Sequence, residues 1–135
     1  MATGLTTLTL HDLVCGLVGN RLPPSSVPGA DEVRIRQAVI DSRLATPGSM
    51  FVALRGQELD GNDFVADAFA RGAVAAIAER APPGAVCTAW PASEVQQCRL
   101  GDATCLVVPD SLTALQRVAA HWRRQHPVRV IGITG

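Results

Sequence analysis

The chain has 135 residues, of which 47% are hydrophobic and 18% charged, and this length and composition predict a globular chain of one domain, or of two very small ones. Because the formal net charge is +0, no global field draws the chain to nucleic acid or to a membrane surface, and neither is expected as a partner. No stretch reaches the roughly 18 apolar residues of a transmembrane helix, and no signal peptide is predicted, so a cytoplasmic location is expected.

The first expected element is a helix over residues 10–18, where leucine and valine recur at the spacing i, i+3, i+4, i+7 and i+8. Thr9 is its predicted cap and Gly19 its predicted end. The further elements predicted in chain order are a strand at 33–40, a strand at 50–54, a helix at 62–71, a strand at 73–79, a strand at 104–108, a helix that Ser111 caps, and a final strand after 127.

The order of these elements predicts the fold class. Helices and strands interleave, which indicates an α/β domain with a small mixed sheet and flanking helices. The segment 80–103 contains Pro and Gln without periodicity and is interpreted as a surface excursion. In the helix after Ser111, the residues predicted to face the core are Leu112, Leu115, Val118, Ala119 and Trp122.

The chain ends on the strand-like run VIGITG, whose last residues are Thr134 and Gly135. A strand that runs into Thr-Gly is typical of the approach to a phosphate-binding loop with the pattern G-x-x-x-x-G-K-[ST]. Only the first glycine of that pattern is present, and all twelve basic residues are arginine, so no P-loop lysine is available. The hypothesis is therefore the front piece of a larger nucleotide-using enzyme, with residues 127–135 as the linker and first strand of a truncated ATPase domain.

Polar residues follow two of the predicted strands. Asp41-Ser42-Arg43 comes directly after the strand at 33–40, at a strand end of the kind where α/β sheets bind ligands. A second polar loop follows the strand at 50–54, and its candidate residues are Arg55, Gly56, Asp60, Gly61 and Asn62. Glycine lets a backbone approach a ligand and donate N–H groups to phosphate oxygens, so the two loops together suit a nucleotide diphosphate.

The alternative for these loops is turn chemistry alone. In that interpretation Asp41 caps a turn, and Gly56 and Gly61 hold backbone conformations with positive φ. No metal site is predicted, because the four cysteines form no C-x-x-C pair and no histidine lies at zinc-like spacing beside them. No catalytic residue is predicted either, since the three histidines lack partners at catalytic spacing.

The sequence resembles the N-terminal domain of the Mur ligases, which add to UDP-N-acetylmuramoyl peptides. The resemblance rests on D-[ST]-R at Asp41–Arg43, on P-G-x-[LM]-F-V-A-L-x-G at Pro47–Gly56, on D-G-H-D-F at Asp60–Phe64 and on A-x-x-x-G-A at Ala68–Ala73. The tail from Pro109 is similar to the segment that enters the central ATPase domain of the family. One position departs from the pattern: residue 62 is Asn, where the family usually has His.

This resemblance implies a division of labour within a longer enzyme. Residues 1–126 would bind the UDP end of a UDP-N-acetylmuramoyl peptide, with Ser42 and its neighbours on uracil and ribose and the backbone around 55–62 at the diphosphate. ATP and Mg²⁺ would belong to the central domain and the incoming amino component to a C-terminal domain. A monomer is expected, and the 135 residues alone are expected to be inactive as a ligase.

Two members of the family are compatible with the pattern, and two other classes of protein remain as alternatives. The segment DSLTALQRVAAHWRRQ most resembles the member that adds D-alanyl-D-alanine to the UDP-muramoyl tripeptide. The alternative member adds the third amino acid. Outside enzyme function, the chain is either a stand-alone, non-catalytic module that binds a UDP-sugar peptide, or a scaffold domain whose polar loops only build turns.

Overall fold

The structure is a computed structural model. It describes residues 8–18, 33–82, 88–91, 104–125 and 133–134.

The centre of the fold is a six-stranded sheet with the strand order β6-β7-β5-β4-β3-β8, in which every neighbouring pair is parallel. Its strands are β3 (Gln37–Val39), β4 (Ser49–Val52), β5 (Ala75–Ala78), β6 (Thr88–Pro91), β7 (Thr104–Val107) and β8 (Ile133–Thr134). A separate two-stranded antiparallel sheet is formed by β1 (Leu8–Thr9) and β2 (Arg34–Ile35).

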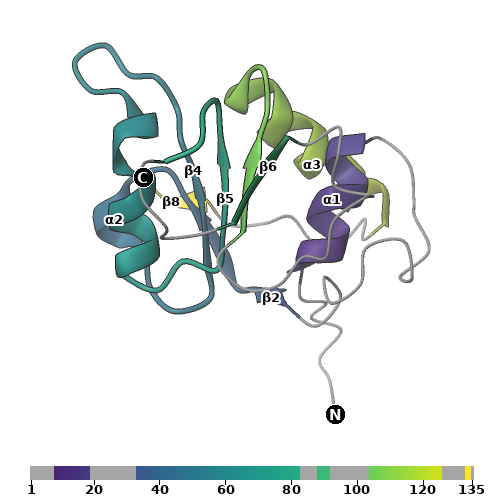
Figure 1. The fold of residues 1–135 in the computed structure, drawn as a ribbon. Helices are drawn as coiled ribbons and strands as arrows, with labels where there is room; N and C mark the ends of the chain where they lie inside the picture. The colour runs from purple at the N-terminus through teal and green to yellow at the C-terminus, as the bar shows by residue number, and fades with distance from the viewer. Residues whose placement is uncertain (1–7, 19–32, 83–87, 92–103, 126–132, 135) are drawn as a thin grey trace.

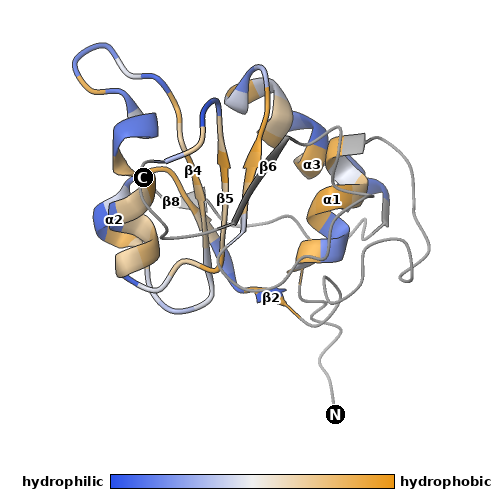
Figure 2. Cartoon of the chain, viewed as in Figure 1, coloured by the Kyte–Doolittle hydropathy of each residue, from blue (hydrophilic) through white to orange (hydrophobic). Residues whose placement is uncertain are grey.

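Helices cover both faces of the parallel sheet (Figure 1). The helices are α1 (Leu10–Val18), α2 (Val65–Ala70) and α3 (Ser111–Gln125). Successive side chains of a strand point to opposite faces, so Met50 and Val52 of β4 pack with α1 and α3, whereas Phe51 packs with α2. Figure 2 shows the resulting hydrophobic colour along β4 and β5. Such strands read as continuous apolar runs because both of their faces are buried.

The start of α1 confirms the predicted cap. The Thr9 hydroxyl accepts a hydrogen bond from the Asp12 backbone N–H at 3.2 Å, and the Asp12 carboxylate accepts one from the Thr9 backbone N–H at 3.0 Å. This reciprocal pair satisfies two backbone donors that a helix start otherwise leaves open.

The predicted α/β class is confirmed, and the structure refines how the strands pair. Among the described strands, antiparallel pairing joins β1 with β2, and the described pairs of the main sheet are all parallel. The strand expected at 33–40 is two strands, because Arg36 separates β2 from β3 and the two join different sheets. The helix expected at 62–71 begins with a 3₁₀ turn at Gly61–Phe64.

Two further expectations change in the C-terminal half. Strand β6 lies inside the segment 80–103, for which the sequence predicts a surface excursion and no strand. β6 ends on Pro91, a residue that sheets tolerate at an edge because it lacks a backbone donor. Strand β8 pairs with β3, so the described part of the chain's end is an edge strand of this same sheet. The assignment of 127–135 to a second domain stays a prediction.

The predicted end of α2 at Gly72 has a clear physical basis. Gly72 has φ +111, and a Cβ added there would lie 2.8 Å from the backbone nitrogen of Pro47. The Gly72 carbonyl also accepts a hydrogen bond from the Gly48 N–H at 3.2 Å. The residue therefore joins the end of α2 to the turn that precedes β4.

We expect Gly72→Ala to lower the free energy of unfolding by about 1–3 kcal/mol, because Ala combines a strained φ with a clash against Pro47. The measurement is urea unfolding followed by circular dichroism. Arg71→Ala is the matched control, since Arg71 is an exposed neighbour with φ −91, and it should change stability by no more than about 0.5 kcal/mol. Equal losses in the two variants would contradict this account of the turn.

Candidate functional site

A hollow of about 840 Å³ opens at the carboxyl ends of β3 and β4. Because β3 lies between β4 and β8, the strand order reverses at β3, and this is the position where open α/β sheets bind ligands. The lining residues are Ile40, Asp41, Ser42, Arg43, Phe51, Leu54, Arg55, Gly56, Leu59, Gly61, Phe64 and Asp67. The structure thus brings the two predicted polar loops together around one cavity, with Asp60 and Asn62 outside its lining.

The first loop is held by Asp41. Its carboxylate caps the 3₁₀ turn at Ser42–Leu44 by accepting a hydrogen bond from the Arg43 N–H at 3.0 Å. The Arg43 guanidinium grips the same carboxylate through Nη2 at 2.7 Å and Nε at 3.0 Å. These bonds lower the pKa of Asp41 from 3.8 to about 2. The capping role proposed for Asp41 is therefore present, and it also orients Arg43 at the cavity.

Ser42 lies beneath this loop with 6% of its surface exposed. The Ser42 side chain is the largest cause that lowers the pKa of Asp67 on α2. Arg71 pairs with the same carboxylate at 3.1 Å, one helical turn along. Ser42 and Asp67 both line the cavity.

The second loop is a tight turn between Arg55 and Asp60, which form an isolated antiparallel bridge. The Gly56 N–H donates to the Leu59 carbonyl at 2.8 Å, and the Gly61 N–H donates to the Leu54 carbonyl at 2.8 Å. These two amides are therefore used within the turn. Among the side chains of this loop that line the cavity, the one that carries a positive charge for an anion is that of Arg55.

The glycines of this turn are required by close backbone approach. A Cβ on Gly61 would lie 2.7 Å from the Leu54 carbonyl oxygen, and one on Gly56 would lie 2.8 Å from the Leu59 carbonyl oxygen. Within the described residues, positive φ occurs at two other glycines, Gly48 and Gly72. The idea that Gly56 and Gly61 hold positive φ is therefore wrong, although both are indeed needed for the turn.

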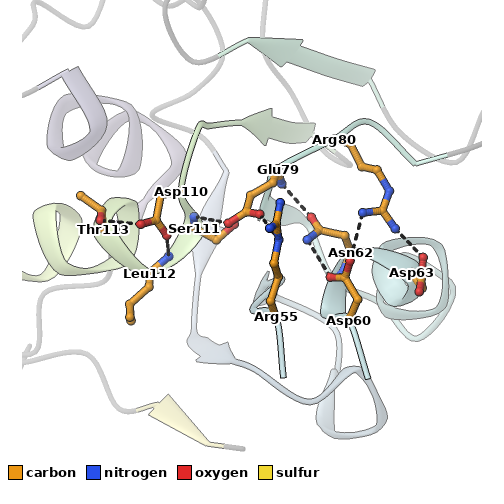
Figure 3. Close-up of polar contacts among 10 residues, drawn as sticks. All are labelled: Arg55, Asp60, Asn62, Asp63, Glu79, Arg80, Asp110, Ser111, Leu112 and Thr113. Atoms are coloured by element: carbon orange, nitrogen blue, oxygen red, sulfur yellow. Dashed lines mark hydrogen bonds and ion pairs between the residues drawn. The ribbon is translucent and has the colours of Figure 1, made fainter. Parts of the chain in front are cut away.

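The partly exposed Asp60 and the buried Asn62 bond to each other at the end of the turn (Figure 3). Asn62 is 3% exposed, and its amide nitrogen donates to Asp60 Oδ1 at 2.8 Å. Its amide oxygen accepts a hydrogen bond from the Glu79 backbone N–H at 2.7 Å. Asp60 also accepts from the Asn62 N–H and from Arg80, which together lower its pKa from 3.8 to about 2. Contact between Asn62 and a diphosphate stays a prediction, and the structure gives Asn62 a clamping role.

Glu79 is a site residue that the sequence reasoning missed. It follows β5 directly, and its Oε1 lies 2.7 Å from Arg55 Nε, while its Oε2 accepts a hydrogen bond from the Ser111 N–H at 3.0 Å. A smaller hollow of about 440 Å³ adjoins it, lined by Leu54, Arg55, Glu79, Pro109, Asp110 and Leu112. The sequence contained a signal for Glu79, because it is the last residue of the strand predicted at 73–79. The carboxyl ends of parallel strands lie at the same edge of a sheet, so Glu79 could have been expected near the two polar loops.

The N-terminus of α3 corrects another expectation. Asp110, rather than Ser111, supplies the cap: its carboxylate accepts from the Leu112 N–H at 3.1 Å and from the Thr113 hydroxyl at 2.9 Å. The Ser111 hydroxyl is buried and has no hydrogen-bond partner within the part of the chain that the structure describes. Leu112 is 50% exposed and lines the smaller hollow, so it does not face the core as predicted. Of the other predicted inward positions, Leu115, Val118 and Trp122 are buried, and Ala119 is partly buried.

The larger hollow has the chemistry of a binding site. Its floor is apolar and partly aromatic through Phe51, Leu54 and Phe64, and Arg43 and Arg55 stand at its rim. No histidine, cysteine or lysine lines it. Within the described residues, no three His, Cys, Asp or Glu side chains gather to hold a metal ion, and no helix there is long and apolar enough to cross a membrane. The arrangement suits a ligand with a ring at one end and an anion at the other.

A parallel sheet covered by helices, with a largely apolar hollow at its carboxyl edge that two arginines and two aspartates also line, defines the class as an α/β ligand-binding domain. The model for the Mur ligase family, catalytic domain, matches residues 34–123. The chain belongs to the Mur ligase family. The matching family model is that of a catalytic domain, whereas these 135 residues alone are expected to be inactive as a ligase. That expected inactivity stays a prediction.

Individual relatives agree with this family. A UDP-N-acetylmuramoyl-tripeptide--D-alanyl-D-alanine ligase of Synechocystis sp. is 32% identical over 107 residues, which cover 78% of this chain and 20% of that protein. A UDP-N-acetylmuramoyl-L-alanyl-D-glutamate--2,6-diaminopimelate ligase of Cytophaga hutchinsonii is 32% identical over 112 residues, covering 82% and 20%. MurF from Acinetobacter baumannii aligns in structure with a TM-score of 0.58 and 27% identity, over 91% of this chain and 22% of that one. The chain spans about a fifth of the length of the relatives it matches.

The depressed pKa of Asp60 predicts a pH dependence of stability. A carboxylate with a folded-state pKa near 2 and an unfolded value of about 3.9 stabilises the fold above pH ~4, and loses that effect as the pH falls toward 2. We expect Asp60→Asn to be less stable than the wild type at pH 7, with a difference that shrinks between pH 4 and pH 2. Urea unfolding across this range measures the difference.

Glu58→Gln is the control for that experiment, because it changes an exposed carboxylate of the same turn. A stability difference between wild type and Asp60→Asn that stays constant from pH 7 to pH 2 would refute the role assigned to the Asp60 charge.

Proposed function

We propose that this chain is the part of a Mur ligase that binds the nucleotide end of a UDP-N-acetylmuramoyl peptide. The observation that carries the proposal is the shared cavity, in which Asp41–Arg43 and the Arg55 turn line one hollow of about 840 Å³ at the strand-order reversal. That volume lies within the ordinary range of small-molecule sites. The family match supports the class of ligand.

Within this proposal the uracil and the diphosphate of the ligand contact different parts of the cavity, one apolar and one with arginine side chains. The uracil ring lies on the apolar floor formed by Phe51, Leu54 and Phe64, with ribose near Ser42. The diphosphate lies at the rim, where Arg43 and Arg55 donate charge-assisted hydrogen bonds. Zero net charge over the whole chain is compatible with this site, because the cationic groups act locally.

The proposal extends to the whole enzyme as follows. Residues 1–126 form the substrate-binding domain, and 127–135 with Thr134 and Gly135 lead into a central ATPase domain. ATP and Mg²⁺ bind in that central domain, and a C-terminal domain binds the incoming amino component. The complete enzyme adds D-alanyl-D-alanine to UDP-N-acetylmuramoyl-tripeptide in peptidoglycan precursor synthesis. The Synechocystis relative and MurF of Acinetobacter baumannii support this choice, and the Cytophaga relative keeps the third amino acid as the alternative.

The competing hypothesis is a stand-alone, non-catalytic module. It would bind a UDP-sugar peptide in the same cavity but would not belong to a ligase. The coding sequence beyond Gly135 separates the two. A continuation with Gly-Lys-Thr completes the P-loop pattern and supports the enzyme, whereas a stop codon supports the module.

We expect UDP to shift the backbone amide resonances of 41–43 and 55–61 in an NMR titration of the chain. Arg43→Ala should weaken UDP binding by about three- to tenfold, because it removes a guanidinium from the rim and leaves the Asp41 carboxylate unpaired beside the diphosphate. Arg123→Ala is the control, since Arg123 is an exposed residue in the last turn of α3 and lines neither hollow. No shift in either loop at millimolar UDP would count against the proposal.

We also expect the 135 residues alone to form no amide bond when mixed with the UDP-muramoyl tripeptide, D-alanyl-D-alanine, ATP and Mg²⁺. The reason is chemical: the larger hollow contains no lysine or metal cluster to hold a triphosphate. Mass spectrometry of the mixture measures the product, and a longer chain that carries the remaining domains is the positive control. Product from the short chain would overturn the division of labour.

A further inference from the structure

Arg55 occupies the junction between the two hollows and lines both of them. Its side chain is 71% exposed, yet its Nε lies 2.7 Å from the Glu79 carboxylate, whose side chain is only 12% exposed. Figure 3 shows Glu79 between Arg55 and the start of α3. This contact is an ion pair and not an aligned hydrogen bond, because Glu79 Oε1 has no hydrogen-bond partner among the described residues. An exposed arginine is thus paired by charge with a carboxylate that is itself nearly buried.

Glu79 is fixed from two sides. Its Oε2 accepts the Ser111 N–H at 3.0 Å at the N-terminus of α3, where the helix dipole favours a negative charge. Its own backbone N–H donates to the buried Asn62 amide oxygen at 2.7 Å. The carboxylate is therefore a rigid anchor, which distinguishes it from the carboxylates of flexible surface ion pairs.

The guanidinium of Arg55 keeps free donors after this contact. Its Nε forms the ion pair with Glu79, and the described residues accept no hydrogen bond from its Nη1 or Nη2. By contrast, Arg43 places both Nε and Nη2 on Asp41. Of the two arginines at the rim of the larger hollow, Arg55 has the more available fork for a second anion.

We propose that Glu79 is a positioning residue that holds Arg55 by Nε and so presents its terminal nitrogens to the diphosphate of a nucleotide in the larger hollow. The inference rests on the proposed function, because it assumes a UDP ligand in that hollow. A long arginine side chain loses rotamer freedom when it binds an anion, and an anchor that restricts it beforehand reduces that loss. The role also explains why the Glu79 amide is clamped by Asn62.

The negative charge of Glu79 also has an effect that would weaken the binding of an anion. The negative charge of Glu79 partly neutralises Arg55, and removing it would raise the positive potential at the cavity. Arg55 is largely exposed, so solvent and salt screen that long-range term, whereas the lost orientation is not screened. We therefore expect Glu79→Gln to weaken the binding of UDP.

The test compares UDP with uridine, which lacks the diphosphate, by isothermal titration of the chain and its variants. Glu79→Gln keeps an oxygen for the Ser111 N–H but loses the ion pair, and UDP should bind about three- to tenfold more weakly while uridine changes by less than about twofold. Arg55→Lys should behave alike, because lysine lacks the planar fork that lets arginine face Glu79 with one nitrogen and a second anion with the others. The double variant should be no weaker than the weaker single variant.

Asp63→Asn is the matched control, since Asp63 also pairs with an arginine, Arg80, but lines neither hollow. It should leave both affinities unchanged. If the wild-type chain binds no UDP, the proposed function fails. If the wild type binds UDP and Glu79→Gln binds it equally well or more tightly, the positioning role fails. An equal loss for UDP and uridine also overturns it, since that is the result of a merely structural residue.

A second comparison applies if Glu79→Gln does not fold. Positioning through Nε predicts that Arg55→Lys binds UDP as weakly as Arg55→Ala, although lysine keeps the charge. An Arg55→Lys variant that matches the wild type would overturn the proposal.

Discussion

One buried amide joins the two loops on which the site depends. Asn62 lies at the end of the turn after β4, and its side chain reaches the backbone of Glu79 at the end of β5, a link between residues 17 positions apart. Because Asn62 is 3% exposed, both ends of its amide need partners, and the structure supplies Glu79 for the oxygen and Asp60 for the nitrogen. Loss of either partner would leave a buried polar group unsatisfied, which costs about 1–3 kcal/mol. The Arg55 turn and the Glu79 carboxylate therefore keep a fixed relation to each other.

The parallel sheet explains why these loops meet at all. Parallel strands bring all of their carboxyl ends to one edge, so segments that follow β3, β4, β5 and β7 converge there despite their separation in the chain. Backbone approach in the Arg55 turn is close enough that Gly61 has no room for a Cβ. The Gly56 and Gly61 amides are bonded within this narrow turn. The side chains of Arg43 and Arg55 line the cavity.

Local features could be predicted from the sequence, and relations between distant residues could not. The cap at Thr9, the end of α2 at Gly72 and the polar residues after β3 and β4 follow from short patterns, and the structure shows each of them. The cap at Ser111 was wrong because the Ser111 N–H bonds to Glu79, 32 residues earlier, and Asp110 supplies the local cap. The strand β6 was missed since Pro and polar residues surround a four-residue edge strand that only its neighbour β7 supports.

Position 62 shows how a departure from the family pattern fits the same geometry. The Mur ligase pattern usually has His there, and this chain has Asn. A neutral imidazole offers one donor and one acceptor, and the Asn62 amide uses one of each, toward Asp60 and Glu79. A residue this deeply buried is poorly placed to carry a positive charge to a ligand. Paired hydrogen bonding is therefore a property that His could share with Asn at this position, and in the proposed function the charge for an anionic ligand comes from Arg43 and Arg55 instead.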